Sequence, residues 1–238
     1  MIEPNLLYGL IIYGVGIAVL VFLSHTLMEA GRRMAPDGRR TAIRLVTGLW
    51  IWAAATNLYA LNTGPEFVWL APAIALPIAL ITTLTYVAPV SRLLENISVA
   101  KLVGVQVYRN AGAVFLLAHF GFGHYLSREF ALNAGWGDVL TGVLAVPVAA
   151  AAYYRVRFWE ALVAAWCLIG TADLIVAPIT AQIYGAMRID DFPLNSIPLF
   201  FGPPLGISLH IVAVRALWLQ RQARRMANPL PAHRSAEA

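Results

Sequence analysis

Several polar side chains lie inside long apolar stretches of this sequence, and four of them are the main candidates for binding or proton transfer. They are Gln106, Arg109, Asp173 and His210. A charged group that faces lipid at the centre of a bilayer costs roughly 3 to more than 10 kcal/mol, so the two charged members must face protein or water. A guanidinium holds anionic groups or pairs with a carboxylate, and an imidazole exchanges a proton near neutral pH. These four are therefore the predicted ligand-binding residues.

Three further polar residues are secondary candidates. Asp138 follows a Gly-Trp-Gly tripeptide where we expect a helix to begin, and an acidic residue there is typical of capping. His119 falls near a predicted membrane interface, which favours a solvated or hydrogen-bonded role. His25 is expected at the same depth as His210, so one alternative is a haem held by these two imidazoles. The chain has no compact metal motif such as His-Glu-x-x-His, so no metal site is predicted.

The composition indicates what kind of elements must position these residues. Hydrophobic residues make up 60% of the 238 residues, charged residues make up 12%, and the mean hydropathy is +0.70. A water-soluble domain with so few charges would lack a polar surface, so we expect an integral membrane protein with the lipid bilayer as its partner. The basic residues behind the net charge of +5 cluster beside apolar stretches, which is typical of orientation signals and excludes nucleic acid as a partner.

Seven apolar stretches are each long enough to cross a bilayer as a helix. They are residues 6–28, 45–62, 67–90, 102–123, 136–154, 158–180 and 195–217. The predicted fold is an all-α bundle of seven transmembrane helices formed by residues 1–219. A polar cytoplasmic tail, residues 220–238, is expected to follow it. The single Cys167 lies inside a predicted span, which excludes a disulfide framework.

Apart from Arg109, Lys and Arg divide unevenly between the two sides of the predicted bundle. Fourteen fall on the side that carries the loop after the first span and the C-terminal tail, and two fall on the other side. Because positively charged loops stay in the cytoplasm, we expect the N-terminus outside and the C-terminus inside. The expected location is the cytoplasmic membrane of a bacterium, crossed by several passes.

Two expectations concern the geometry inside the bundle. Pro203 and Pro204 remove amide donors in the last span, which predicts that this helix bends or unwinds there. With a rise of about 1.5 Å per residue, Arg109 and Asp173 come out roughly 10 Å apart along the membrane normal. We therefore expect no direct contact between these two side chains, and we expect Arg109 to face a hydrated cavity together with His210.

The order of several short motifs resembles that of a widespread group of small bacterial membrane proteins with seven spans. The shared pattern is Q-x-[YF]-R, then G-x-x-FL, then FA-x-x-AG-x-GD-x-x-x-G, followed by an Asp in the sixth span and P-x(4)-P-x(6)-H in the seventh. This chain carries it in QVYRNAGAVFLL, FALNAGWGDVLTG, GTADL and PLFFGPPLGISLH. The resemblance covers residues 100–217 and implies a family but no particular activity. It marks Gln106, Arg109, Asp138, Asp173 and His210.

These observations favour a protein that binds or transports a small ligand, anionic or lipidic, in a polar cavity within the membrane. A non-catalytic membrane subunit or scaffold is the first alternative, because buried polar groups also fix helix packing. Further alternatives are the haem protein and a membrane-embedded enzyme that uses Asp173 or His210 as acid or base on a lipidic substrate. A retinal protein is excluded, because the one lysine, Lys101, lies at the start of the fourth span.

The charge distribution generates a test of topology. A cysteine introduced as Arg39→Cys, after the first span, should resist a membrane-impermeant maleimide in intact cells and react once the cells are permeabilised. A cysteine introduced as Gly64→Cys, between the second and third spans, should react in intact cells. Labelling of position 39 from outside would contradict the predicted orientation.

Overall fold

Helices make up the fold throughout the residues that the computed structural model describes, which are 4–34, 36–63, 70–121, 126–184 and 196–227; no strand occurs in these ranges. The segments are α1 (Pro4–Arg32), α2 (Pro36–Thr63), α3 (Leu70–Leu84), α4 (Ala88–Asn96), α5 (Val99–Gly104), η2 (Val105–Gly112), α6 (Ala113–Phe120), α7 (Arg128–Tyr154), α8 (Trp159–Ile183) and α9 (Ser196–Ala227). All are α-helices except η2, which is a 3₁₀-helix.

Four helices are long and apolar enough to cross a membrane, judged by length and composition over the described residues. They lie at Gly9–Arg32, Arg128–Tyr154, Trp159–Ile183 and Phe201–Ala227. A fifth is obtained if α3 and α4, which meet at an angle of 85°, count together as one broken span. The prediction of an all-helical protein with apolar helices of membrane length is therefore confirmed.

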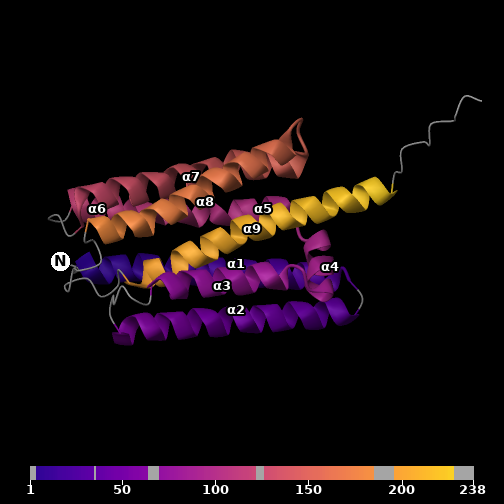
Figure 1. Cartoon of the computed structure of the whole chain (residues 1–238), viewed down its shortest axis with the longest axis horizontal. Helices are drawn as coiled ribbons and strands as arrows, with labels where there is room; N and C mark the ends of the chain where they lie inside the picture. Colours follow the sequence, from indigo (N-terminus) through magenta and orange to yellow (C-terminus); the bar gives the residue numbers. More distant parts are fainter. Residues whose placement is uncertain (1–3, 35, 64–69, 122–125, 185–195, 228–238) are drawn as a thin grey trace, which may run out of the picture.

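The long helices lie roughly side by side, and α9 runs between two groups of them (Figure 1). On one side α7 packs against α8, and on the other side α1 packs against α2. α9 contacts α8, α3 and α2, while η2 contacts both α7 and α1. The segment from α5 through η2 to α6 therefore has neighbours from both groups.

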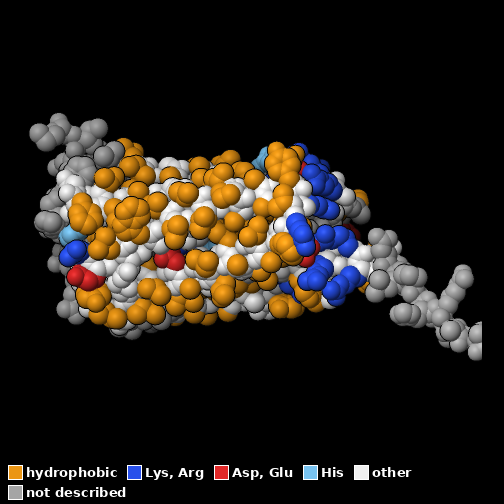
Figure 2. Space-filling model, turned by 90° about the horizontal axis from the view of Figure 1, so that it is seen from above, with side chains coloured by type: hydrophobic (Ala, Val, Ile, Leu, Met, Phe, Trp, Pro, Cys, Tyr) orange, Lys and Arg blue, Asp and Glu red, His pale blue; other side chains and the backbone are white. Residues whose placement is uncertain are grey.

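Apolar side chains cover much of the outer surface, as Figure 2 shows for one face. Leu76 of α3 and Leu168 of α8 are examples of large apolar side chains that are well exposed. The Lys and Arg side chains on this face gather mainly at one end of the bundle (Figure 2). An apolar belt of this extent is what a surface in contact with lipid or other protein requires, whereas Leu93 and Val163 belong to the buried core inside it.

The middle of the predicted fourth span is 3₁₀-helical. η2 is eight residues long, whereas 3₁₀ segments of more than three or four residues are uncommon. With three residues per turn, every third side chain points the same way, and the buried residues of η2 include Gln106, Arg109 and Gly112. An α-helix would turn each of these by about 60° from the one before. The tighter helix therefore aligns them on one face.

The predicted third span, residues 67–90, does not continue straight to its end. α3 stops at Leu84, and the chain turns by 85° into α4. The turn is stabilised by two hydroxyls: Thr85 donates to the carbonyl of Thr82 at 2.7 Å, and Ser91 donates to the carbonyl of Thr85 at 2.7 Å. These bonds occupy backbone acceptors that a continuing helix would otherwise have paired.

α9 is a continuous α-helix through Pro203 and Pro204, so the predicted unwinding there is wrong. Each proline removes one hydrogen bond within the helix, but the side chain of Pro204 is among those that are fully buried in the core. Packing against neighbouring helices therefore holds the helix together where backbone hydrogen bonds are missing.

The same helix extends past the predicted end of the membrane domain. α9 continues to Ala227, through residues 220–227 of the predicted tail. Gln220 anchors this extension, because its side-chain amide donates to the carbonyl of Ile97 at 2.8 Å and lies 3.4 Å from that of Leu94. The extension is thus tied to the end of α4.

The close approach of α1 and α2 generates a test of packing. A methyl group on Gly31 would lie 2.7 Å from Cβ of Ala42 and 2.9 Å from the carbonyl oxygen of Gly38. Gly31→Ala should therefore lower the free energy of unfolding by about 1 to 3 kcal/mol. Gly48→Ala is the matched control, because open space surrounds that position. Equal thermal unfolding midpoints in detergent for the two variants would contradict this packing.

Candidate functional site

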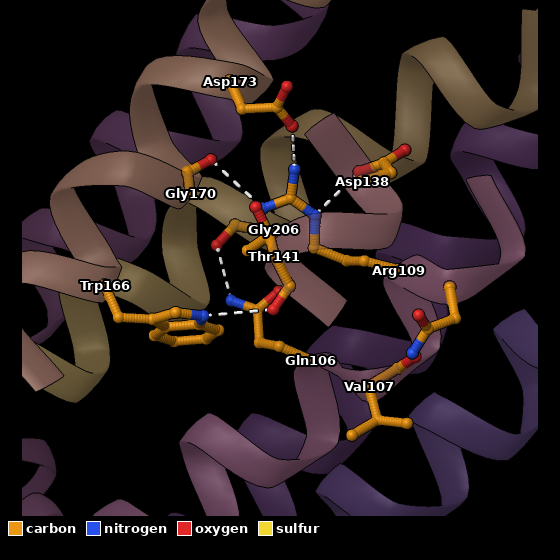
Figure 3. A network of polar contacts seen from close by, with 10 residues as sticks. Gln106, Val107, Arg109, Asp138, Thr141, Trp166, Gly170, Asp173 and Gly206 are labelled. Atoms are coloured by element: carbon orange, nitrogen blue, oxygen red, sulfur yellow. Dashed lines mark hydrogen bonds and ion pairs between the residues drawn. The ribbon is translucent and has the colours of Figure 1, made fainter. Parts of the chain in front are cut away.

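Arg109 is the centre of a network that joins η2 to α7 and α8 (Figure 3). Its Nε donates to Oδ1 of Asp138 at 2.7 Å, its Nη1 donates to the carbonyl of Gly170 at 3.1 Å, and its Nη2 donates to Oδ2 of Asp173. The guanidinium side chain is only 1% exposed, against 19% for Asp138 and 16% for Asp173. We call Arg109, Asp138 and Asp173 the ionic cluster.

The expectation that Arg109 does not contact Asp173 is wrong, since their side chains form an ion pair. The depth estimate assumed ideal α-helices that end where the apolar stretches end. α8 instead continues to Ile183, which places Asp173 about 5 Å deeper than the estimate at 1.5 Å per residue. η2 rises by about 2.0 Å per residue, which moves Arg109 further towards it. The two corrections remove most of the offset.

Asp138 is a member of the cluster and not a helix cap, so the capping interpretation is wrong. The prediction started the helix at Trp136, but α7 begins at Arg128. Asp138 therefore lies ten residues into α7, where an unpaired carboxylate would be costly. Its ion pair with Arg109 supplies the missing partner.

Three glycines create the room that the cluster occupies. An added Cβ at Gly137 would overlap the carboxylate of Asp173, and one at Gly112 would lie 2.7 Å from Oδ2 of Asp138. A Cβ at Gly170 would lie 3.0 Å from Nη1 of Arg109. A side chain at any of the three positions would push a charged group away from its partner.

Gln106 and His210 lie beside the ionic cluster. Gln106 is fully buried and its side-chain amide lies 3.3 Å from the carbonyl of Gly206, to which it donates (Figure 3). A Cβ added at Gly170 would lie 2.5 Å from Nε2 of His210 and 3.0 Å from Nη1 of Arg109. The two nitrogens are therefore at most 5.5 Å apart. The structure thus brings all four predicted residues together.

Several buried polar atoms around His210 have no hydrogen-bond partner among the described residues. They are Oε1 of Gln106, the hydroxyls of Tyr108 and Thr141, and both ring nitrogens of His210. The ring of His210 packs at 4.8 Å against that of Trp166, whose indole N–H donates to the carbonyl of Thr141 at 3.1 Å. Sequence reasoning did not select Tyr108 or Trp166 as site residues, because buried aromatic residues also occur in apolar cores.

The remaining candidate histidines lie apart from this group. His25 is exposed, whereas His210 is 1% exposed and its Nε2 abuts Gly170. The two residues therefore do not form a bis-histidine haem site. Nδ1 of His119 lies 2.8 Å from the carbonyl of Leu126, and because a carbonyl only accepts, this nitrogen carries the proton. No group of three metal-binding side chains occurs among the described residues.

A cavity of about 170 Å³ adjoins the ionic cluster between α1, α2, η2, α6, α7, α8 and α9. Its walls are mainly apolar, with Tyr13, Phe115, Phe130 and Phe201 among them. Arg109 and Asp138 are the charged residues in its described lining, whereas Gln106, Asp173 and His210 are not part of that lining. The predicted pairing of Arg109 with His210 across a cavity is therefore not what the structure shows.

Helices of membrane length, a buried ionic cluster and an adjoining apolar cavity define an all-helical protein of membrane type with an internal polar site. The chain belongs to the family described as domain of unknown function DUF8737, whose model matches residues 67–218. No curated protein and no solved structure matches the chain. The matched segment contains the whole ionic cluster, whereas α1 and α2 precede it.

The cluster geometry predicts a specific pattern of stabilities. Arg109→Leu should lower the free energy of unfolding by about 3 to 5 kcal/mol, because it leaves two buried carboxylates without a cation. Adding Asp138→Asn and Asp173→Asn should restore most of that loss, because it removes both unpaired charges. Unfolding in neutral detergent measures both effects.

Arg221→Leu is the matched control, because Arg221 is exposed and lies 3.9 Å from Glu160. It should change the free energy of unfolding by less than about 1 kcal/mol. A triple variant no more stable than Arg109→Leu alone would show that the ion pairs do not determine the stability of this region.

Proposed function

We propose that this chain is a polytopic membrane protein that binds a small ligand in the cavity beside the ionic cluster. The observation that carries the proposal is the composition of the cavity wall: apolar and aromatic side chains surround the space, and charged groups meet it at Arg109 and Asp138. Small-molecule sites commonly combine an apolar enclosure with a few fixed polar groups. The buried cluster, held by three helices, supplies those groups in a fixed position.

The proposal includes seven spans, with the N-terminus outside and the C-terminus in the cytoplasm of a bacterium. The helical segments support this count if α5, η2 and α6 together form one span, the others being α1, α2, α3, α7, α8 and α9. The orientation is supported by the basic side chains that gather at one end of the bundle (Figure 2), since the cytoplasmic ends of spans carry the excess of Lys and Arg.

The size of the cavity supports a ligand with a compact apolar body. A cavity of about 150 Å³ with apolar walls can hold a molecule the size of benzene, and this cavity has about 170 Å³. Its walls come from seven helical segments, so a ligand would contact both groups of helices in the bundle.

The three bonds of Arg109 change the role that sequence reasoning assigned to it. Each of its nitrogens already donates to a carboxylate or a carbonyl. We therefore propose that Arg109 orients the two carboxylates, and that it does not itself hold an anionic ligand. His210 is separated from the cavity, which disfavours the enzyme alternative in which it acts on a bound substrate.

A non-catalytic subunit or scaffold is the second candidate. The observation that favours it is the near-complete burial of Arg109, because a saturated ionic network also fixes the relative positions of helices. Such a protein would not depend on the space in the cavity, and this difference separates the two candidates.

Two glycines of α1 offer a matched pair for the test. Gly16 lines the cavity and Gly14 does not, and an added Cβ would meet nothing within 4 Å at either position. Gly16→Leu should fill the cavity and abolish ligand binding, while Gly14→Leu should retain it. The measurement is native mass spectrometry for small molecules that co-purify, followed by thermal shift with small aromatic probes in neutral detergent.

The scaffold candidate predicts a different result for the same pair. Under that candidate no molecule co-purifies, no probe raises the unfolding temperature of the wild-type protein, and the two leucine variants behave alike. This result would overturn the proposed binding function.

A further inference from the structure

We infer that the ligand of this cavity is a small organic cation, with its positive charge beside Asp138 and its apolar body against the aromatic walls. The inference rests on the proposed binding function and adds the chemical class of the ligand. It follows from the charge of the ionic cluster, from the oxygen of Asp138 that has no hydrogen bond among the described residues, and from the lining of the cavity.

With both carboxylates ionised, the ionic cluster has one positive and two negative groups and carries an excess of one negative charge. Arg109 contacts both carboxylates, and no other charged residue belongs to the described lining of the cavity. A buried negative charge without a partner is unfavourable, because desolvation is not compensated. The cluster therefore favours a cation in the adjoining space.

His210 does not provide the missing positive charge. Its two ring nitrogens have no acceptor among the described residues, and its Nε2 is at most 5.5 Å from Nη1 of Arg109, from the two distances of 2.5 Å and 3.0 Å given above. A protonated ring would place two buried donors without partners beside a guanidinium. The described groups beside it include Arg109, Trp166 and Gly170, and none of these three is anionic.

The carboxylate of Asp138 is the part of the cluster with room to receive a cation. Only its Oδ1 takes part in a hydrogen bond among the described residues, so Oδ2 remains as an acceptor. The Asp138 side chain is 19% exposed and lines the cavity, whereas the Arg109 side chain is 1% exposed and uses every nitrogen. An anionic ligand would meet the surplus carboxylate first and be repelled.

The aromatic walls suit the same class of ligand. Tyr13 of α1, Phe115 of α6, Phe130 of α7 and Phe201 of α9 all line the space. Aromatic faces attract a cation most strongly where water is excluded, and they also pack against an apolar ring or chain. A cation with an apolar body therefore gains from both parts of the cavity.

An isosteric pair of probes isolates the charge. N-Methylpyridinium and toluene have the same shape and differ by one positive charge, and benzoate carries a negative charge on a similar ring. Isothermal titration to the purified full-length protein in dodecyl maltoside should show the cation binding at least about tenfold more tightly than the neutral isostere, and no binding of the anion. Gly16→Leu should abolish binding of both positive and neutral probes.

Asp138→Asn removes the surplus charge and leaves the Arg109–Asp173 pair, so the preference for the cation should fall to about one. Asp138→Glu keeps the charge and should retain the preference, which guards against a loss caused by misfolding. The comparison of the two isosteres in the wild-type protein needs no variant at all.

Equal affinities of the wild-type protein for the cation and its neutral isostere, or a preference that survives in Asp138→Asn, would overturn the inference. If the probes bind in that case and Gly16→Leu abolishes their binding, the proposed binding function is still supported. If neither probe binds, both the inference and the proposed function fail. The two failures are therefore distinguishable.

Discussion

The burial of one guanidinium is the constraint on which the rest of this structure depends. Arg109 donates to two carboxylates and one backbone carbonyl, and these three acceptors come from α7 and α8 while Arg109 itself lies on η2. A charge removed from water must have such partners, because breaking a buried ion pair costs about 3 to 5 kcal/mol, a large part of the stability of about 5 to 15 kcal/mol that a typical domain has. The three segments are therefore held in one relative position.

That position requires both an unusual helix and small residues around it. The period of three in η2 sets Gln106, Arg109 and Gly112 on one face, and Gly112, Gly137 and Gly170 leave the space that the cluster fills. Glycine within a helix costs about 1 kcal/mol relative to alanine, and a long 3₁₀ segment has poorer hydrogen bonds than an α-helix. Here the ionic contacts, which neither an α-helical segment nor larger side chains would allow, offset those losses.

The sequence was sufficient to predict apolar helices of membrane length and to select Gln106, Arg109, Asp173 and His210, because a polar residue inside an apolar stretch is itself a signal. It was not sufficient to predict the contact between Arg109 and Asp173, since hydropathy does not locate the end of α8 or the rise of η2. For the same reason the start of α7 was predicted too late, and Asp138 was interpreted as a capping residue. Seven spans and their orientation stay predictions from charge and hydropathy.

The charges of the ionic cluster and the shape of the cavity depend on different parts of the chain. All three members of the cluster lie within residues 67–218, the segment that the family model matches. The opposite wall of the cavity includes Tyr13, Gly16 and Leu20 of α1, which lies before that segment. None of these α1 residues bonds to the cluster, so a substitution on α1 can change the volume of the cavity without altering the charge at its polar wall. Under the proposed function, α1 would therefore set the size of the ligand, and the cluster would separately set its charge.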